Sequence, residues 1–287
     1  MITLQYEHLV LTSFKIYLEN LLLTKGGAFT NSSGYFYSVP SANQYYTYSL
    51  PYQPVVADQS VAGANIMSGL YVSGVFCTTG VSGLIDINYE KGQAYFSSPI
   101  ANPETQLSGR FAISDFNIKL TSDPEEFLLL ETKHFLKPKT TVPVTGLGNN
   151  DITYPVIYIK NYGGQNEEYA FGGTEKTVNT FRLLILADSQ YALDGVFSII
   201  KDRARTVVPM LTGITELPYN NLGGVNNGYN YKVLTTGRFH SSDSFWLDKV
   251  HTSTLHGVGY VHFRNLNPTV FVGVIDLSIN GYRQPRS

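Results

Sequence analysis

Apolar residues near the N-terminus recur at spacings of three and four positions over the range 3–24. This period places them on one face of an α-helix, so we predict an amphipathic helix packed on a core. The stripe consists of Val10, Leu11, Phe14, Tyr17, Leu18 and Leu21. Gly26 and Gly27 follow it and predict where the helix ends.

From Phe29 to Pro138 the pattern changes. Apolar and polar residues alternate in short runs, and turn residues separate these runs. The alternation favours strands that bury one face, and a turn at Glu90–Gly92 predicts a hairpin. The candidate strands are Leu70–Cys77, Gly83–Tyr89, Gln93–Phe96, Phe111–Leu120 and Phe127–Phe135. We therefore predict an all-β domain, a sandwich or a barrel, inserted at residues 29–138.

After a Gly- and Asn-rich linker at 140–151, the second half predicts a sheet with one helix packed on it. Asp188 or Ser189 is a plausible N-cap for that helix, and Pro209 closes it. Its apolar stripe is Leu193, Val196, Phe197, Ile200 and Ala204. The predicted strands are Pro155–Tyr162, Val178–Ala187, Tyr231–Phe239, Gly257–Phe263 and Val270–Ile279, with Gly163–Lys176 as a connection.

These elements predict an α+β fold, in which an antiparallel sheet with packed helices carries the inserted all-β domain. Residues 1–28 supply the N-terminal helix of the α+β core, 29–138 the inserted domain, and 139–287 the remainder of the core.

Composition narrows the function classes. Charged residues make up 15% of the 287 residues, below the roughly 25% of an ordinary soluble chain, while there are 21 Tyr and 26 Gly. Such a surface suits protein interfaces, where aromatic side chains are enriched and charges depleted. The net charge of −2 gives no basic footprint for nucleic acid, so we expect no direct sequence-specific nucleic-acid binding.

The sequence carries no clear signal for membrane insertion, secretion or disulfide formation. The apolar stretch Leu9–Leu23 contains Lys15 and Glu19 and is too short and polar to span a bilayer, so we expect no membrane association. No Lys or Arg precedes Lys15, so the basic start of a secretory signal is missing. Cys77 is the single cysteine and lies in an apolar run, which predicts a buried, inert thiol and no disulfide.

A search for chemistry finds no catalytic, cofactor or metal site. His251, His256 and His262 lie beside Asp243 and Asp248, but their spacing fits no metal motif. We expect surface or interface histidines there.

Other candidate motifs have structural explanations. The pairs Gly163–Gly164 and Gly172–Gly173 lack the remainder of a phosphate-binding motif and predict turns. The acidic pairs Glu125–Glu126 and Glu167–Glu168 are adjacent, so we read them as solvated loop charges. Ser189 lacks the G-x-S-x-G context of an exposed nucleophile, and a helix cap explains it better. We expect a protein that is not an enzyme and needs no cofactor.

The pattern over Pro155–Arg205 resembles that of phage tail-terminator or neck proteins. It combines a strand at Val156–Ile159, the glycine pair in Phe171–Gly173, a strand ending in Leu186–Ser189, and a helix ending in Lys201–Asp202. Segments of the inserted domain are also similar to modules of tailed-phage structural proteins. These are Tyr48–Tyr52, Asp58–Ala64, Gly83–Tyr89 and Phe111–Asn117.

This resemblance implies a small α+β subunit that closes into a homo-hexameric ring at the end of the tail tube. It implies a virion protein of the tail or neck, assembled in the host cytoplasm, whose partners are copies of itself and other phage tail and neck proteins. The inserted β region makes this chain longer than the smallest terminators, and the resemblance assigns it no role.

Two alternatives stay open. The first is a peripheral baseplate, collar or receptor-binding virion protein whose Tyr-rich module binds saccharide. The second is a hydrolase with a β accessory domain, for which the residues above offer no site.

Under the ring hypothesis, interfaces follow from edge strands and exposed polar faces. Edge strands near Thr153–Tyr162 or Val270–Ile279 could pair between subunits. The loops Gly163–Gly173 and Asn220–Asn230 are further candidates. The interface residues that we predict are Ile157, Tyr158, Asp194, Lys201, Asp202 and Arg205.

Overall fold

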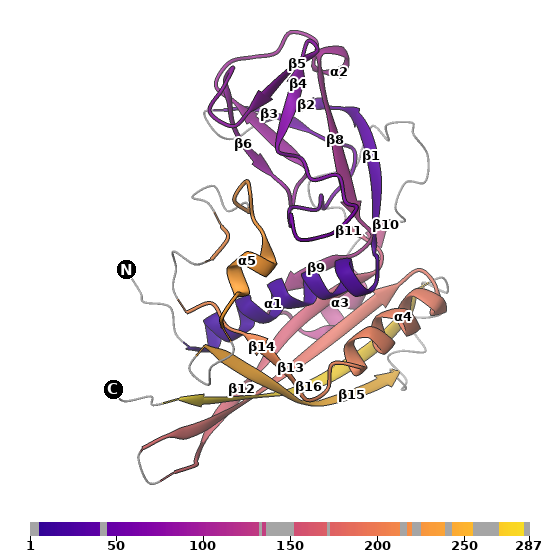
Figure 1. Ribbon diagram of the computed structural model, residues 1–287. Helices are drawn as coiled ribbons and strands as arrows, with labels where there is room; N and C mark the ends of the chain where they lie inside the picture. The colour runs from indigo at the N-terminus through magenta and orange to yellow at the C-terminus, as the bar shows by residue number, and fades with distance from the viewer. Residues whose placement is uncertain are drawn as a thin grey trace.

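The computed structural model is a mixed α/β fold, mostly β, in which an all-β module stands on a core sheet (Figure 1). Figure 1 places the β module above α1 and the core sheet below this helix. The structure describes residues 6–40, 45–131, 134–135, 152–170, 173–212, 217–219, 225–238, 243–254 and 270–283.

The β module consists of two four-stranded sheets that enclose a separate hydrophobic core. Their apolar residues alternate along short strands, so each sheet buries one face against the other. One sheet has the order β1 (Phe29–Tyr35), β8 (Leu107–Ser114), β4 (Gly69–Val72), β5 (Val75–Thr78). The other has the order β2 (Tyr37–Val39), β3 (Tyr46–Ser49), β7 (Gln93–Phe96), β6 (Leu84–Asn88), and a short helix, α2 (Pro103–Gln106), precedes β8.

The core is a six-stranded sheet in which all pairs are antiparallel except β9 with β12. Its order is β14 (Thr206–Pro209), β15 (Ser244–Thr254), β16 (Phe271–Arg283), β13 (Glu175–Ala187), β12 (Val156–Glu168), β9 (Asn117–Leu120). The parallel pair forms because β9 enters from the β module, on the outer side of β12. A parallel two-residue pair, β10 (His134–Phe135) with β11 (Ile152–Thr153), stands apart from this sheet.

Helices cover both faces of the core sheet. The helices α1 (Tyr6–Lys25) and α4 (Gln190–Lys201) share one hydrophobic cluster with the sheet, in which Phe14 packs against Phe181 at 5.7 Å between ring centroids. On the opposite face, α3 (Glu125–Glu131) contributes Leu128 to a second cluster. A short helix, α5 (Tyr231–Thr235), packs Tyr231 beside Ile16 of α1.

Several predicted elements are confirmed. The N-terminal helix forms over Tyr6–Lys25, and Gly27, with a φ of 58°, follows its end. The hairpin at Glu90–Gly92 joins β6 and β7 as predicted. Ser189 is the N-cap of α4, accepting a hydrogen bond from the Ala192 N–H at 3.2 Å. Leu193, Val196 and Ile200 form its buried stripe.

Two predicted strands are pairs of strands instead. Leu70–Cys77 is divided by a turn at Ser73 and Gly74, where φ is 50° and 83°, into the hairpin β4–β5. Phe111–Leu120 is divided at Asp115 and Phe116, where the chain leaves the β module, so that β8 and β9 lie in different sheets. Residues 117–120, expected in the inserted domain, therefore pair within the core sheet.

Two other predicted strands begin as helices, although the first of them, Phe127–Phe135, ends in the two-residue strand β10 (His134–Phe135). Phe127–Phe135 begins inside α3, whose first turn is set by Pro124, because the Pro124 carbonyl accepts hydrogen bonds from the N–H groups of Phe127 and Leu128. Tyr231–Phe239 begins as α5, capped by the Asn230 side chain, which accepts from the Val233 N–H at 3.1 Å. In the second case the Asn230 cap starts a helix where the sequence pattern predicts a strand.

The second half differs from its prediction in three further places. Gly163–Lys176 is mostly strand rather than connection, because β12 runs to Glu168 and β13 begins at Glu175. Ala204 and Pro209 lie beyond α4, and Pro209 ends β14 rather than closing the helix. Strand β15 has no counterpart in the prediction. The predicted strand Gly257–Phe263, the linker 140–151 and residues 220–224 of the predicted loop lie outside the described residues.

Within the described part of the chain, no helix is long and apolar enough to cross a membrane.

Candidate functional site

The outer half of β12 is a free strand edge. β9 pairs with β12 only over Val156–Ile159, and from Lys160 to Glu168 the described strands leave β12 paired with β13 alone. Together with the ends of β13 and β16, this half forms an arm that projects from the body at the lower left of Figure 1. An unpaired edge presents N–H and C=O groups that can pair with another strand.

The base of the arm is fixed by ionic contacts across three elements. The Arg182 guanidinium of β13 donates to both carboxylate oxygens of Asp276 on β16, at 2.6 and 3.0 Å. It also donates to Glu125 of α3 at 3.1 Å, and Glu125 accepts from the Tyr162 hydroxyl at 2.9 Å. Glu125 is thus a structural ion-pair partner on a helix rather than the solvated loop charge that the sequence predicts.

The charges around Arg182 reinforce one another. The hydrogen bonds that Arg182 donates to Asp276, and then the one to Glu125, raise the pKa of Arg182 above its ordinary value, against the opposing effect of burial. The Tyr162 ring lies 5.0 Å from this guanidinium and 5.4 Å from the Lys160 ammonium. Such contacts tie β12, β13 and β16 to α3 at the base of the arm.

The arm carries a β-bulge and an acidic end. The register with β13 shifts between Asn161 and Gly164, where Gly163 has a φ of 94° and its N–H donates to the Asn161 side chain at 2.8 Å. Gly163 and Gly164 therefore shape a bulge within a strand. Near the end of the strand, Glu167 pairs with Lys176 at 3.6 Å, while Glu168 is exposed and has no ion-pair partner among the described residues.

The opposite edge of the same sheet is β14. It pairs with β15 alone within the described chain. Its first two residues, Thr206 and Val207, are half-buried, and the last two are buried. The exposed charged residues that flank it are Lys201, Asp202 and Arg205, which leave one net positive charge. Arg205 has a φ of 63°, and its N–H donates to the Leu247 carbonyl at 2.6 Å. No described carboxylate forms an ion pair with Lys201 or Arg205.

The structure separates the six residues predicted for the interface. Ile157 and Tyr158 are buried, at 0% and 4% exposure, because their stretch of β12 lies between β9 and β13. The prediction that this stretch is an edge strand is wrong, and so is the same prediction for Val270–Ile279, since β16 lies between β13 and β15. Asp194, Lys201, Asp202 and Arg205 are exposed on α4 and the turn after it, and their interface role stays a prediction.

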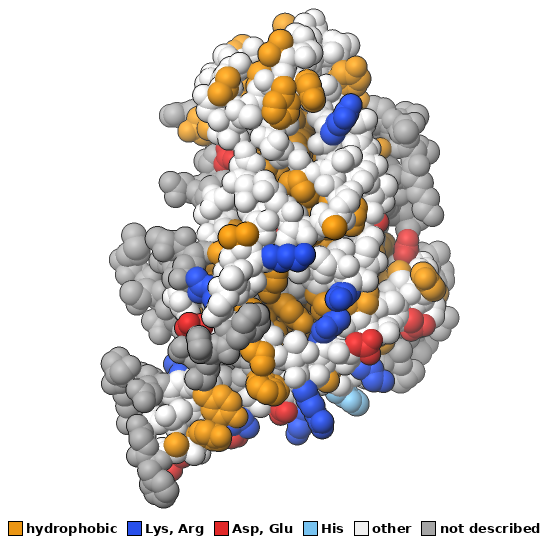
Figure 2. Space-filling view, in the orientation of Figure 1, with side chains coloured by type: hydrophobic (Ala, Val, Ile, Leu, Met, Phe, Trp, Pro, Cys, Tyr) orange, Lys and Arg blue, Asp and Glu red, His pale blue; other side chains and the backbone are white. Residues whose placement is uncertain are grey.

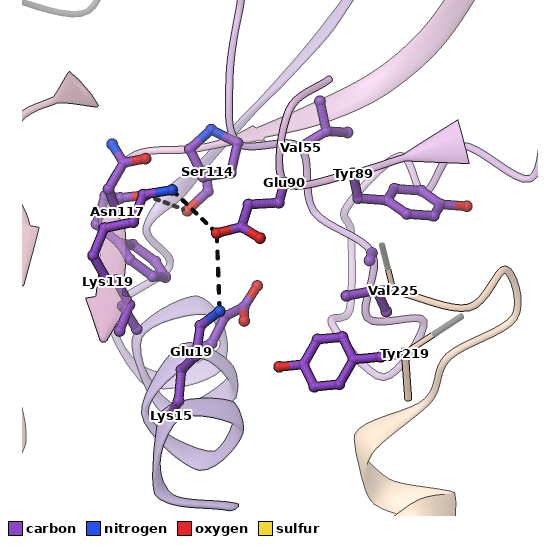
Figure 3. A pocket seen from close by; sticks show the side chains of 14 residues that line it. Lys15, Glu19, Val55, Tyr89, Glu90, Ser114, Asn117, Lys119, Tyr219 and Val225 are labelled. Atoms are coloured by element: carbon purple, nitrogen blue, oxygen red, sulfur yellow. Dashed lines mark hydrogen bonds and ion pairs between the residues drawn. The ribbon is translucent and has the colours of Figure 1, made fainter. Parts of the chain in front are cut away.

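The β module and the core meet at a cluster of charges (Figure 3). Glu90, from the β6–β7 turn, points between two lysines: its carboxylate lies 3.1 Å from Lys119 of β9 and 3.9 Å from Lys15 of α1. Glu19, one helical turn after Lys15, lines the same small cavity of about 40 Å³, and Tyr219 closes its other side. These contacts tie the module to the first helix.

Asp58 makes a second tie and is almost fully buried, at 3% exposure. Its carboxylate accepts hydrogen bonds from the Asn20 side chain of α1 at 2.6 Å, from the N–H and hydroxyl of Ser60 at 2.8 and 3.0 Å, and from the Tyr231 N–H of α5 at 2.9 Å. A buried carboxylate is tolerated when such donors satisfy it. This one joins α1, the module and α5.

The remaining candidate residues do not converge. His251 is exposed on β15, whereas His256 and His262 lie outside the described residues. Cys77 is buried on β5, as predicted. Among the described residues, no three His, Cys, Asp or Glu side chains are grouped so that they could hold a metal ion.

Sequence comparison adds no relative: no known protein family matches the chain, and no curated protein matches it.

Proposed function

We propose that this chain is a self-assembling structural subunit of a tailed-phage virion, a tail-terminator or neck protein that closes into a ring. The observation that supports the proposal is that, among the described strands, one sheet has two edges without a strand partner, and these edges differ in charge. The arm edge of β12 ends in the exposed acid Glu168, whereas the β14 edge is flanked by Lys201, Asp202 and Arg205, with one net positive charge.

Different edges favour a head-to-tail contact. The arm of one copy pairs with the β14 edge of the next, so the same joint repeats around the assembly and closes when the rotation allows. Backbone hydrogen bonds between the edges supply affinity, and the opposite charges select this orientation over arm-to-arm or β14-to-β14 pairing. The place in the virion rests on the resemblance of the Pro155–Arg205 pattern, which β12, β13 and α4 realise as strand, strand and helix.

A charge swap tests the joint. Glu168→Arg and Arg205→Glu should each raise the concentration needed for assembly about tenfold, because each places like charges across the contact. The double variant should assemble like the unmodified protein. Mass photometry over a dilution series measures the oligomer fraction, and Glu104→Arg on α2 is the control, because Glu104 is exposed and lies away from both edges.

Assembly of both single variants at unchanged concentration would show that these edges are not the joint. So would a double variant as impaired as the worse single one, since restored complementarity is what the contact predicts.

A further inference from the structure

The β module has an open groove of about 650 Å³, within the range of roughly 300–1,000 Å³ typical of small-molecule sites. Four tyrosines line it: Tyr35 of β1, Tyr37 of β2, Tyr52 after β3, and Tyr71 of β4. The face of the module that Figure 2 shows carries few charged side chains. The charged residues of 29–114 are Asp58, Asp86, Glu90, Lys91, Glu104 and Arg110.

Strand register places aromatic rings in a row across the outer face of one sheet. Tyr35 pairs with Ser108, Ser108 with Tyr71, and Tyr71 with Phe76, so all four side chains project from the same face. Tyr35, Tyr71 and Phe76 are 48%, 37% and 46% exposed. Their sequence neighbours Phe36, Leu70 and Cys77 are buried, which fixes the row as the outward-facing set.

The row has a spacing suited to an extended ligand. Tyr35 and Tyr71 are two strands apart, roughly 10 Å, and the rings of Tyr71 and Phe76 lie 5.2 Å apart. Aromatic side chains present an apolar face with, for tyrosine, a polar tip. A chain of linked pyranose rings matches both features, because each ring has an apolar face of C–H groups and a rim of hydroxyls.

Polar groups line the same groove. Ser33 and Ser108 project from the same face of the sheet as Tyr35, and their hydroxyls can both donate and accept hydrogen bonds. Arg110 pairs in register with Ser33, is exposed, and forms no hydrogen bond or ion pair among the described residues. Among the described residues, no carboxylate lines the groove. Burial and then the charge of nearby Glu104 raise the pKa of Tyr37, but Glu104 forms no ion pair with Arg110. The Arg110 guanidinium therefore suits a carboxylate or phosphate group on the ligand.

We infer that this groove binds an oligosaccharide that carries an anionic substituent. Tyr35 and Tyr71 stack on sugar faces, the serines pair with sugar hydroxyls, and Arg110 contacts the anionic group. The site lies on the β module and does not depend on the two edges of the core sheet. Saccharide binding can therefore be tested independently of ring assembly.

Binding of the full-length chain to a panel of neutral, carboxylate-bearing and phosphate-bearing oligosaccharides tests the inference. The unmodified protein should bind at least one anionic oligosaccharide of the panel with a dissociation constant below about 1 mM. Tyr35→Ser and Tyr71→Ser should each weaken that binding about tenfold. The matched control is Tyr46→Ser on β3, which removes a tyrosine of 46% exposure that does not line the groove and should leave binding unchanged.

Arg110→Gln separates saccharide binding from simple anion binding. It should abolish the preference for anionic over neutral members while leaving residual binding that still depends on Tyr71. The inference is overturned if no panel member binds, if the groove variants bind like the unmodified protein, or if Tyr46→Ser weakens binding equally. It is also overturned if inorganic phosphate alone competes as well as the best oligosaccharide, because the tyrosines would then contribute nothing.

Discussion

Glu19 and Glu90 line the same cavity, yet their pKa values shift in opposite directions. Burial raises the pKa of Glu19 above its ordinary 4.5, and the charge of Lys15 only partly offsets it. Burial acts on Glu90 in the same sense, but the charges of Lys15 and Lys119 outweigh it and lower the pKa of this carboxylate. Position relative to two lysines therefore decides which acid stabilises the fold at neutral pH.

Glu19→Gln should be more stable than the unmodified protein at pH 7. Because the folded pKa of Glu19 lies above the unfolded one, its ionisation opposes folding as pH rises above 4.5, and the penalty is constant above the folded pKa. The gain in unfolding free energy should therefore shrink as pH falls toward 4.5. Urea denaturation at several pH values measures it.

Glu90→Gln changes the other acid of the same cavity. This variant should be less stable than the unmodified protein at pH 7. The stabilising contribution of Glu90 is present above pH 4.5 and is lost as pH falls through the lowered folded pKa. The loss at pH 7 should stay below about 1 kcal/mol, because the Glu90 side chain is 40% exposed and solvent screens it. Parallel pH profiles for the two variants would contradict this assignment.

At the scale of elements, α4 lies close against the core sheet at a glycine. A Cβ atom on Gly273 of β16 would overlap the Phe197 ring and approach the Leu193 side chain to 2.9 Å. Gly195 lies in the same helix, where a Cβ would meet nothing within 4 Å. The glycine in the strand is thus required for packing, while the glycine in the helix is not.

Gly273→Ala should lower the free energy of unfolding by about 1–3 kcal/mol, since the Phe197 ring and the Leu193 side chain must shift to admit the Cβ atom. Gly195→Ala should raise it by roughly 0.5–1 kcal/mol, because alanine is the better helix former and fits without contact. Chemical denaturation of both variants measures the two signs, and a tolerated Gly273→Ala would mean that α4 packs more loosely than described.

Sequence patterns predicted elements whose signals are local. The Ser189 cap, the Gly92 turn and the apolar face of α1 each depend on residues within a few positions. The patterns failed where tertiary partners decide. Nothing in Phe111–Leu120 shows that the run changes sheets at Asp115, because both halves are equally apolar.

For the candidate interaction surfaces, too, local features could be predicted from the sequence and features set by tertiary partners could not. The exposure of four polar residues could be predicted, because they lie opposite the apolar stripe of the predicted helix: Asp194, Lys201, Asp202 and Arg205. The strands that pair on both sides of Ile157 and Tyr158 could not be predicted. An edge strand is one that lacks a neighbouring strand on one side. Local hydrophobic periodicity does not predict the order of strands in a sheet, so it cannot identify the edge strands. The aromatic row Tyr35–Tyr71–Phe76 likewise emerges only from strand register.

At the scale of the whole molecule, the contacts between the module and the core, and the two sheet edges without a partner among the described strands, suit a subunit of a larger assembly. Asp58 and the Lys15–Glu90–Lys119 cluster bind the β module to α1 and β9, so the module moves with the core. The arm and β14 remain on opposite edges of one sheet for contact between copies. In a closed ring, each module would then be presented at the same angle around the axis.

The mass of the purified protein in solution, measured by light scattering or mass photometry across a concentration series, tests ring formation most directly. One chain weighs 31.8 kDa, so a closed hexamer weighs about 191 kDa. We expect a species of that mass that persists on dilution and appears as a ring in negative-stain images. A chain that stays monomeric at every concentration, or that forms a dilution-resistant trimer, would contradict the hexameric ring.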